Sequence, residues 1–175
     1  SRRTYAAMVK SLDNGVGRVL DVIDELNLEK NTMVIFLSDN GGPELTNYSD
    51  NGVLRGSKSE PYEGGIRVPM AIKWPSVYPS GLSFDKNISS LDFFSTIIGS
   101  ANIDFPKKKS LDGVDLTPCL VDSDCSALDR FLYFRSQAGW KVVLSPHSVK
   151  IVSHDITSQF KKKNTESYDL INDPS

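Results

Sequence analysis

Several residue types that would point to a specialised class of protein are scarce in this chain. It has only two cysteines and two histidines in 175 residues, so a structural zinc site is not expected. Lys and Arg number 20 against 22 Asp and Glu, a formal net charge of -2, so no bulk field draws the chain to nucleic acid or an anionic membrane. No apolar run is long enough to span a bilayer. The remaining composition, 39% hydrophobic and 24% charged, is that of an ordinary globular protein.

The two cysteines, Cys119 and Cys125, lie close together in a polar segment. They are either free thiols or a small-loop disulfide formed in an oxidising compartment, and the sequence leaves both open. Two acceptor sequons, at Asn47 and Asn87, agree with a secreted glycoprotein but also arise by chance. The segment Ser1 to Thr4 does not open a signal peptide, because no apolar core follows it.

The most informative segment is an apolar run, Met33 to Leu37, that ends abruptly in Ser38-Asp39-Asn40-Gly41-Gly42. α/β proteins place their chemistry at the carboxyl ends of such buried strands. Asp39 and Asn40 offer hard oxygen donors, which calcium and magnesium prefer. The glycines let the backbone turn sharply and approach a ligand closely. The alternative is a plain turn, because Asp, Asn and Gly are common turn residues.

A second polar cluster follows, in Leu54 to Lys58 and in Glu63 to Pro69. A metal-ligand pair followed by a lysine in a glycine-rich loop predicts a site for an anionic group, with Lys58 as its cation. The alternative for Lys58 is a surface lysine. Arg55 and Arg67 are interpreted as structural, each pairing with Glu63 or Asp50 to brace the loop, and Glu63 as an anchor of the glycine turn.

Periodicity predicts an α/β unit followed by a short helix and a small antiparallel sheet. Asp92 is expected to cap the short helix with its carboxylate. The long glycine-rich loop between the first two strands is typical of a functional loop. The expected segments are a helix over 6–26, strands over 33–38 and 68–74, a helix over 93–101, and strands over 131–134, 140–144, 149–152 and 168–171.

In combination these motifs resemble the C-terminal portion of the sulfatase family (arylsulfatase-like) within the alkaline phosphatase superfamily. The likeness covers nearly the whole chain. Its segments are Ala6 to Leu26, Asp39 to Gly42, Leu54 to Lys58, Glu63 to Pro69, Ile88 to Ala101, Leu111 to Val114 and Tyr168 to Pro174.

The resemblance implies an α/β fold: residues 1–106 as the C-terminal part of an alkaline-phosphatase-like parallel sheet domain, and 107–175 as a small antiparallel C-terminal subdomain. It implies that Asp39 and Asn40 ligate calcium and that Lys58 contacts the sulfate of a sulfate ester, aryl or carbohydrate. Calcium takes about 6 to 8 oxygens, so two residues cannot complete its site. The family nucleophile comes from a Cys-x-Pro-Ser-Arg segment, which this sequence lacks.

We therefore expect a hydrolase fragment that needs the remaining N-terminal part of the enzyme and is inactive alone. The family compartments are secreted, lysosomal or periplasmic. A phosphoryl-transfer enzyme of the same superfamily and a non-catalytic sulfatase-like binding protein are the alternatives. The substrate itself is not specified by the sequence.

Overall fold

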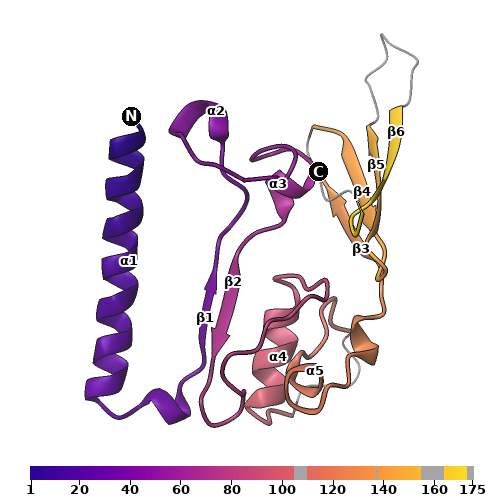
Figure 1. The fold of residues 1–175 in the computed structure, drawn as a ribbon. Helices are drawn as coiled ribbons and strands as arrows, with labels where there is room; N and C mark the ends of the chain where they lie inside the picture. The colour runs from indigo at the N-terminus through magenta and orange to yellow at the C-terminus, as the bar shows by residue number, and fades with distance from the viewer. Residues whose placement is uncertain (105–109, 137, 155–163, 173–175) are drawn as a thin grey trace.

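The computed structural model describes residues 1–104, 110–136, 138–154 and 164–172, and Figure 1 shows how their elements are arranged. The sequence also predicts solvated loops at the lysine runs 107–109 and 161–163, and both runs lie outside the described residues. In chain order the elements are α1 (Arg2–Glu25), η1 (Glu29–Asn31), β1 (Val34–Leu37), α2 (Glu44–Asn47), α3 (Glu63–Ile66), β2 (Met70–Lys73), α4 (Asp92–Ser100), α5 (Thr117–Asp122), η2 (Ser126–Leu128), β3 (Leu132–Arg135), β4 (Trp140–Leu144), β5 (Val149–His154) and β6 (Asn164–Asp169).

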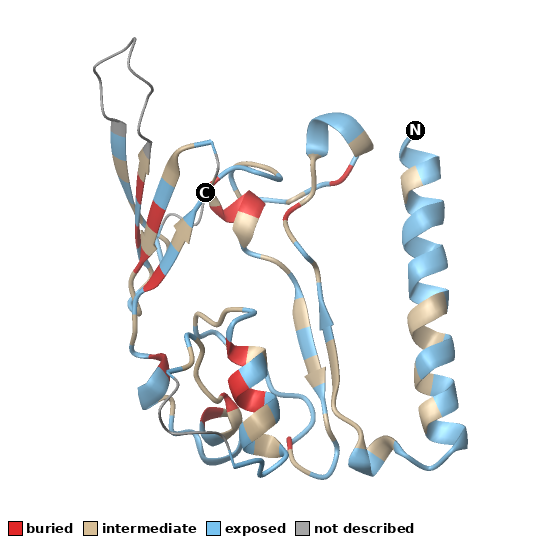
Figure 2. Cartoon of the chain, turned by 180° about the vertical axis from the view of Figure 1, so that it is seen from behind, coloured by how far each residue is buried: buried red, intermediate tan, exposed pale blue. Residues whose placement is uncertain are grey.

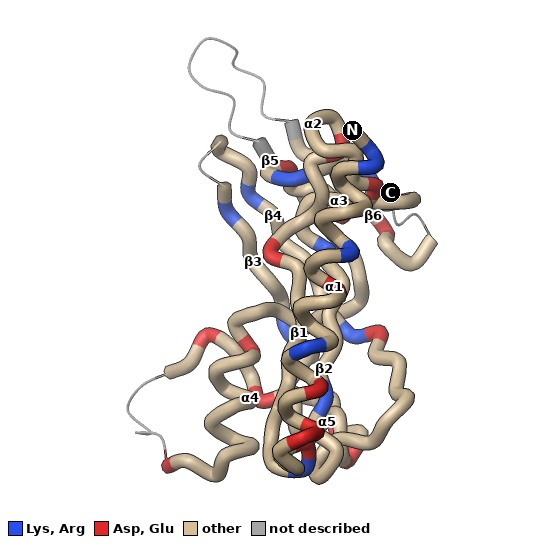
Figure 3. Tube along the Cα trace, turned by 90° about the vertical axis from the view of Figure 1, so that its left-hand side faces the viewer, with Lys and Arg blue, Asp and Glu red and all other residues tan. Residues whose placement is uncertain are grey.

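Helix α1 confirms the predicted first helix, and it stands at one side of the molecule (Figure 1). Its first turn carries basic residues and no acidic one, and its last turn carries acidic residues and no basic one, with both signs mixed between them (Figure 3); the helix dipole disfavours this arrangement at both ends. None of its residues is buried, and Figure 2 shows no buried position along it. Its stability must therefore come from packing partners that the described residues do not supply. The exposed apolar side chains of α1 are Met8, Val9, Leu12, Val19 and Val22.

Strands β1 and β2 form a two-stranded ribbon beside α1 (Figure 1). Both were predicted from their apolar runs, and the observed strands lie within the expected ranges. They pair antiparallel, with Val34 opposite Lys73 and Leu37 opposite Met70. The parallel pairing expected of this half is therefore not made between these two strands. A mixed sheet is common in α/β domains, since an antiparallel strand often joins a parallel sheet.

The chain exposes far more surface than its mass predicts. Its accessible area is 12597 Å², whereas a compact monomer of 19.3 kDa exposes about 8,500 Å². Phe36, Leu37 and the apolar side of α1 are among the large apolar groups open to solvent. Exposed apolar area of this kind contributes nothing to stability, because its burial is the main driving force of folding.

Helix α4 differs from expectation at its start. Asp92 is the first residue of the helix and does not cap it, so the predicted capping role is wrong. Its buried carboxylate instead accepts hydrogen bonds from the amides of Ser89, 2.8 Å, and Val114, 3.0 Å. Arg130 Nη2 also donates to it at 2.5 Å. Asp92 therefore links α4 to the segments on either side. Its buried carboxylate has three hydrogen-bond donors, as a buried polar group requires.

Cys119 and Cys125 form a disulfide, which decides between the two possibilities that the sequence left open. The bond closes the end of α5, a short helix that periodicity did not predict. Cys119, Leu116 and Leu128 make a small buried core against which Ile88 and other apolar residues pack. This core and the Asp92–Arg130 ion pair join residues on both sides of position 106, and the predicted domain boundary there stays a prediction.

The C-terminal half is a four-stranded antiparallel sheet in the order β3-β4-β5-β6, as the sequence predicts. Val142, Leu144 and Val152 are buried on it. The last strand was predicted over 168–171, but it runs over Asn164–Asp169 and ends in a turn. The prediction placed the strand too far toward the C-terminus because it relied on the apolar pair Leu170-Ile171. β6 is instead a polar edge strand, held mainly by backbone pairing with β5.

Candidate functional site

The site is built by three glycine-rich segments, residues 38–42, 54–58 and 63–65. The first continues the β1–β2 pairing, since the amide of Gly41 donates to the carbonyl of Gly65 at 3.0 Å. The segments touch backbone to backbone: a Cβ on Gly41 would lie 1.7 Å from the carbonyl oxygen of Gly64. A Cβ on Gly64 would lie 2.1 Å from the carbonyl oxygen of Gly56. Only glycine allows this approach, which accounts for the glycines of both motifs.

Asn51 ties two of these segments together. Its Oδ1 accepts from the Gly42 amide at 2.8 Å, and its Nδ2 donates to the carbonyls of Gly42, 3.0 Å, and Gly56, 3.1 Å. The amide of Lys58 also donates to the Gly42 carbonyl, at 3.4 Å. The backbone that carries Asp39 is thereby fixed relative to the backbone that carries Lys58.

Asp39 and Asn40 lie at the carboxyl end of β1, where the sequence predicted metal ligands. Asp39 is exposed and Asn40 is half-buried. Asp39 Oδ1 accepts from the Asn40 amide at 3.0 Å, and Asn40 Nδ2 donates to the Gly41 carbonyl at 2.9 Å. These oxygens suit calcium by their chemistry. The described residues contain no group of three or more His, Cys, Asp or Glu side chains that could hold a metal, so the pair needs further donors.

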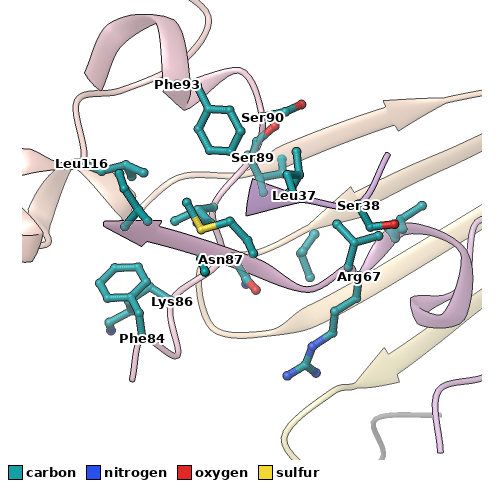
Figure 4. Close-up of a pocket in the computed structure, with 18 of the residues that line it drawn as sticks. Leu37, Ser38, Arg67, Phe84, Lys86, Asn87, Ser89, Ser90, Phe93 and Leu116 are labelled. Atoms are coloured by element: carbon teal, nitrogen blue, oxygen red, sulfur yellow. The ribbon is translucent and has the colours of Figure 1, made fainter. Parts of the chain in front are cut away.

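Lys58 lines the same cavity as Asp39 and Asn40. The cavity has a volume of about 1430 Å³ and extends from the carboxyl end of β1 along the β1–β2 ribbon to the loop before α4. Figure 4 shows part of its wall, with Ser38 and Arg67 at one end and Phe84 and Leu116 at the other. The three predicted site residues are therefore placed around one common space.

The ion-pair partners expected for Arg55 and Arg67 need correction. Arg55 braces the loop, but its partners are in β6: Nη1 donates to Tyr168 Oη at 2.6 Å and lies 3.5 Å from Glu166 Oε2. Glu63 does anchor the glycine turn, through an ion pair with Lys150. Arg67 is exposed and takes part in none of the ion pairs seen among the described residues.

Lys150 and Glu166 were missed by sequence reasoning because they lie in the C-terminal sheet, about ninety or more residues after the loop that they contact. One signal was present for Lys150. It lies two residues before Val152 on β5, so both side chains point to the same face of the sheet, and both are buried. A lysine on a buried face predicts a buried acidic partner. No comparable signal marks Glu166, on the polar edge strand.

The sequence predicts a surface or core position for His147, because it lies in no motif, and His147 is exposed and does not line the cavity. The side chain of His154 lies outside what the structure describes. Cys119 and Cys125 are joined to each other, so neither thiol is available as a nucleophile.

The chemistry that this arrangement suits is the binding of an anion. A pair of residues with oxygen donors for a divalent cation and a lysine line one cavity, and glycine backbones allow close approach of a ligand. Positive charges held in fixed positions can stabilise negative charge that develops on a tetrahedral oxyanion. The arrangement defines the class of the site: a candidate site for an oxyanion ester.

Comparison with known proteins agrees with this class. The family model Sulfatase matches residues 1–103, and the model N-sulphoglucosamine sulphohydrolase, C-terminal, matches residues 57–175. The chain therefore belongs to the sulfatase family, as the sequence motifs indicated.

The individual relatives are much longer proteins, and this chain matches only part of each. The chain is 34% identical over 136 residues to steryl-sulfatase of Homo sapiens, covering 74% of this chain and 23% of that protein. It is 33% identical over 183 residues to a sulfatase of Formosa agariphila, covering 96% of this chain and 33% of that protein. The crystal structure of Ps i-CgsB in complex with k-i-k-neocarrahexaose superposes with a TM-score of 0.84 and 30% identity, over 98% of this chain and 37% of the other. The fold class is thus confirmed, and the chain spans about a quarter to a third of the length of these relatives.

Proposed function

We propose that the complete protein hydrolyses sulfate esters, with Asp39 and Asn40 as ligands of a calcium ion and Lys58 as a ligand of the sulfate group. The observation that carries the proposal is the placement of these three residues around one cavity in a chain of the sulfatase family. The glycine contacts and the Asn51 hydrogen bonds give them a fixed backbone spacing.

Calcium bound at this position would act as a Lewis acid toward the oxygens of the ester. Asp39 and Asn40 would contribute at most three or four of its oxygen ligands, so residues of the N-terminal part of the enzyme must complete the site. Asp39 is exposed, so its carboxylate is accessible to them.

Lys58 would place its ammonium group against the sulfate oxygens and stabilise the charge that grows on them as the ester bond breaks. Its backbone amide is held by the Gly42 carbonyl, while its side chain is free of the ion pairs described here. The nucleophile is proposed to come from another part of the complete protein as formylglycine. This sequence has no Cys-x-Pro-Ser-Arg segment, and the chain alone is proposed to be inactive.

The test uses the complete protein and a matched pair of aryl esters, one sulfate and one phosphate, with calcium present or removed by a chelator. Lys58→Ala should lower kcat/KM for the sulfate ester by about 10²–10³-fold, the loss typical for removal of one group that stabilises transition-state charge. Lys10→Ala is the control, since Lys10 lies on α1 and is exposed.

Each outcome separates the candidate functions. Sulfate turnover that falls with chelation and with Lys58→Ala supports the proposal. Preferred turnover of the phosphate ester would favour the phosphoryl-transfer alternative. Binding of calcium and sulfate without turnover of either ester would favour a non-catalytic binding protein. Sulfate turnover unchanged in Lys58→Ala would refute the role of the lysine.

The compartment is proposed to be the secretory route, the lysosome or the periplasm. The Cys119–Cys125 disulfide supports an oxidising compartment. Among the described residues no helix is both long and apolar enough to cross a membrane. The substrate class stays at sulfate esters, aryl or carbohydrate.

A further inference from the structure

The turn formed by Glu63, Gly64 and Gly65 is a common support for both sides of the candidate site. The carbonyl of Gly65 accepts from the Gly41 amide at 3.0 Å, next to the proposed metal ligands. The amide of Gly64 donates to the Arg55 carbonyl at 2.7 Å, in the segment that leads to Lys58. All three residues of the turn are buried. A displacement of this turn would therefore move the two sides of the site relative to each other.

Lys150, on the C-terminal sheet, reaches the turn itself through an ion pair with Glu63. Lys150 Nζ, on β5, donates to Glu63 Oε1 at 2.7 Å, and the two side chains are only 1% and 6% exposed. Burial lowers the pKa of Lys150, and the bond to Glu63 opposes that shift, so Lys150 depends on Glu63 to keep its charge. Removal of one partner leaves an uncompensated charge in the interior.

A second contact joins the same loop to the same sheet. The Arg55 guanidinium lies 3.9 Å from the centroid of the Tyr62 ring and bonds to Tyr168 on β6. Tyr62 in turn donates to Glu166 Oε2 at 3.3 Å. These groups are partly exposed, so they add less to stability than the buried pair does. They hold the loop against the sheet at a second point. The Glu63–Lys150 pair, which is buried, is the main anchor.

We propose that Lys150 is a positioning residue of the site, which acts through Glu63 to fix the spacing between the Asp39–Asn40 pair and Lys58. It touches neither the proposed cation nor the proposed sulfate. The proposal gives the C-terminal sheet a role in catalysis, and its activity readout rests on the proposed function.

The first experiment compares Lys150→Met in the complete protein with Lys141→Met, a change of an exposed lysine on the neighbouring strand β4. For Lys150→Met, kcat for an aryl sulfate should fall about 10- to 100-fold per folded molecule, more than KM rises, because a misplacement of about 1 Å has effects of this size. Lys141→Met should keep kcat within about 2-fold.

The double variant Glu63→Gln/Lys150→Met distinguishes positioning from stability alone. It removes both buried charges, so its unfolding midpoint in urea should recover most of the loss seen in Lys150→Met. Its kcat should stay low, because the bond between Lys150 and the turn is absent and only the partly exposed contacts of Arg55 and Tyr62 remain. Recovery of kcat together with the midpoint would overturn the proposal, and so would Lys150→Met with normal kcat.

A second readout does not depend on turnover. Amide hydrogen exchange in residues 38–42 and 54–58 should be at least about 10-fold faster in Lys150→Met and in the double variant than in the unchanged protein, and unaffected in Lys141→Met. Equal exchange rates would overturn the positioning role even if the enzyme is active. Faster exchange in a protein that hydrolyses no sulfate ester would support the anchor and refute only the proposed function.

Discussion

Substitution of Gly41 by alanine is the sharpest test of how the candidate site is built. The added Cβ would lie 1.7 Å from the Gly64 carbonyl oxygen and 2.7 Å from its carbon, and both are backbone atoms that cannot swing away. Since contacts under 3.0 Å essentially do not occur, the two segments must separate by roughly 1.3 Å. That motion lengthens the Gly41–Gly65 hydrogen bond and shifts Asp39 and Asn40 away from Lys58.

The expected result of Gly41→Ala is a loss of about 100-fold in kcat/KM for an aryl sulfate, the effect of an ångström-scale misplacement of reacting groups. Calcium affinity, measured by calorimetry, should fall as well. The free energy of unfolding should drop by about 1–3 kcal/mol, as for other overpacked positions. Activity is therefore normalised to the folded fraction.

The control is Gly15→Ala in α1, where an added Cβ meets nothing within 4 Å. Alanine in a helix interior is favoured over glycine by about 1 kcal/mol, so this variant should be as active as the unchanged protein and slightly more stable. The reasoning is refuted if Gly41→Ala keeps both its calcium affinity and its kcat/KM, because the segments would then not set the geometry of the site.

Two further predictions concern the C-terminal half. Arg130→Met should lower the free energy of unfolding by about 3–5 kcal/mol in urea titrations, because it leaves the fully buried Asp92 carboxylate uncompensated. The control, Lys10→Met, breaks an exposed ion pair and should lower it by less than about 1 kcal/mol; equal losses in the two variants would contradict the argument. Burial, together with the hydrogen bond to Glu166, raises the pKa of Tyr168 to about 12, so the folded state keeps a proton that unfolded tyrosines lose near pH 10. This contribution to stability is complete below about pH 10 and is lost as the pH rises from 10 toward 12; denaturant midpoints should show the decline, and Tyr168→Phe should lessen it.

The local elements could be predicted because their sequence patterns are typical of helices and strands. The apolar residues of α1 recur every three or four positions, and β1 and β2 are short apolar runs bounded by breakers. The glycine motifs predict where the candidate site lies, and at Gly41, Gly64 and Gly65 nearby backbone atoms leave no room for a Cβ. These features depend on residues near one another in the sequence, which is why sequence reasoning reached them.

The features that were missed depend on distant partners. Asp92 looks like a helix cap, yet its carboxylate accepts hydrogen bonds from the Val114 amide and from Arg130, which are 22 and 38 residues away in the sequence. β6 was misplaced because its polar residues pair through the backbone with β5. The supports of the lysine loop, Lys150 and Tyr168, are about ninety or more residues away from Glu63 and Arg55. Tertiary contacts of this kind override local preference, and no single segment reveals them.

The buried lysine on β5 has a consequence for shortened gene products. The ligands proposed in this chain all lie before residue 60. From the motifs alone, a premature stop codon near residue 148 would be expected to leave the site intact. Such a product would lose β5 and β6, and with them the partner of Glu63, which would leave that acid buried without its counter-charge. During translation, too, the segments that carry Asp39, Asn40 and Lys58 would lack this support until β5 and β6 have left the ribosome.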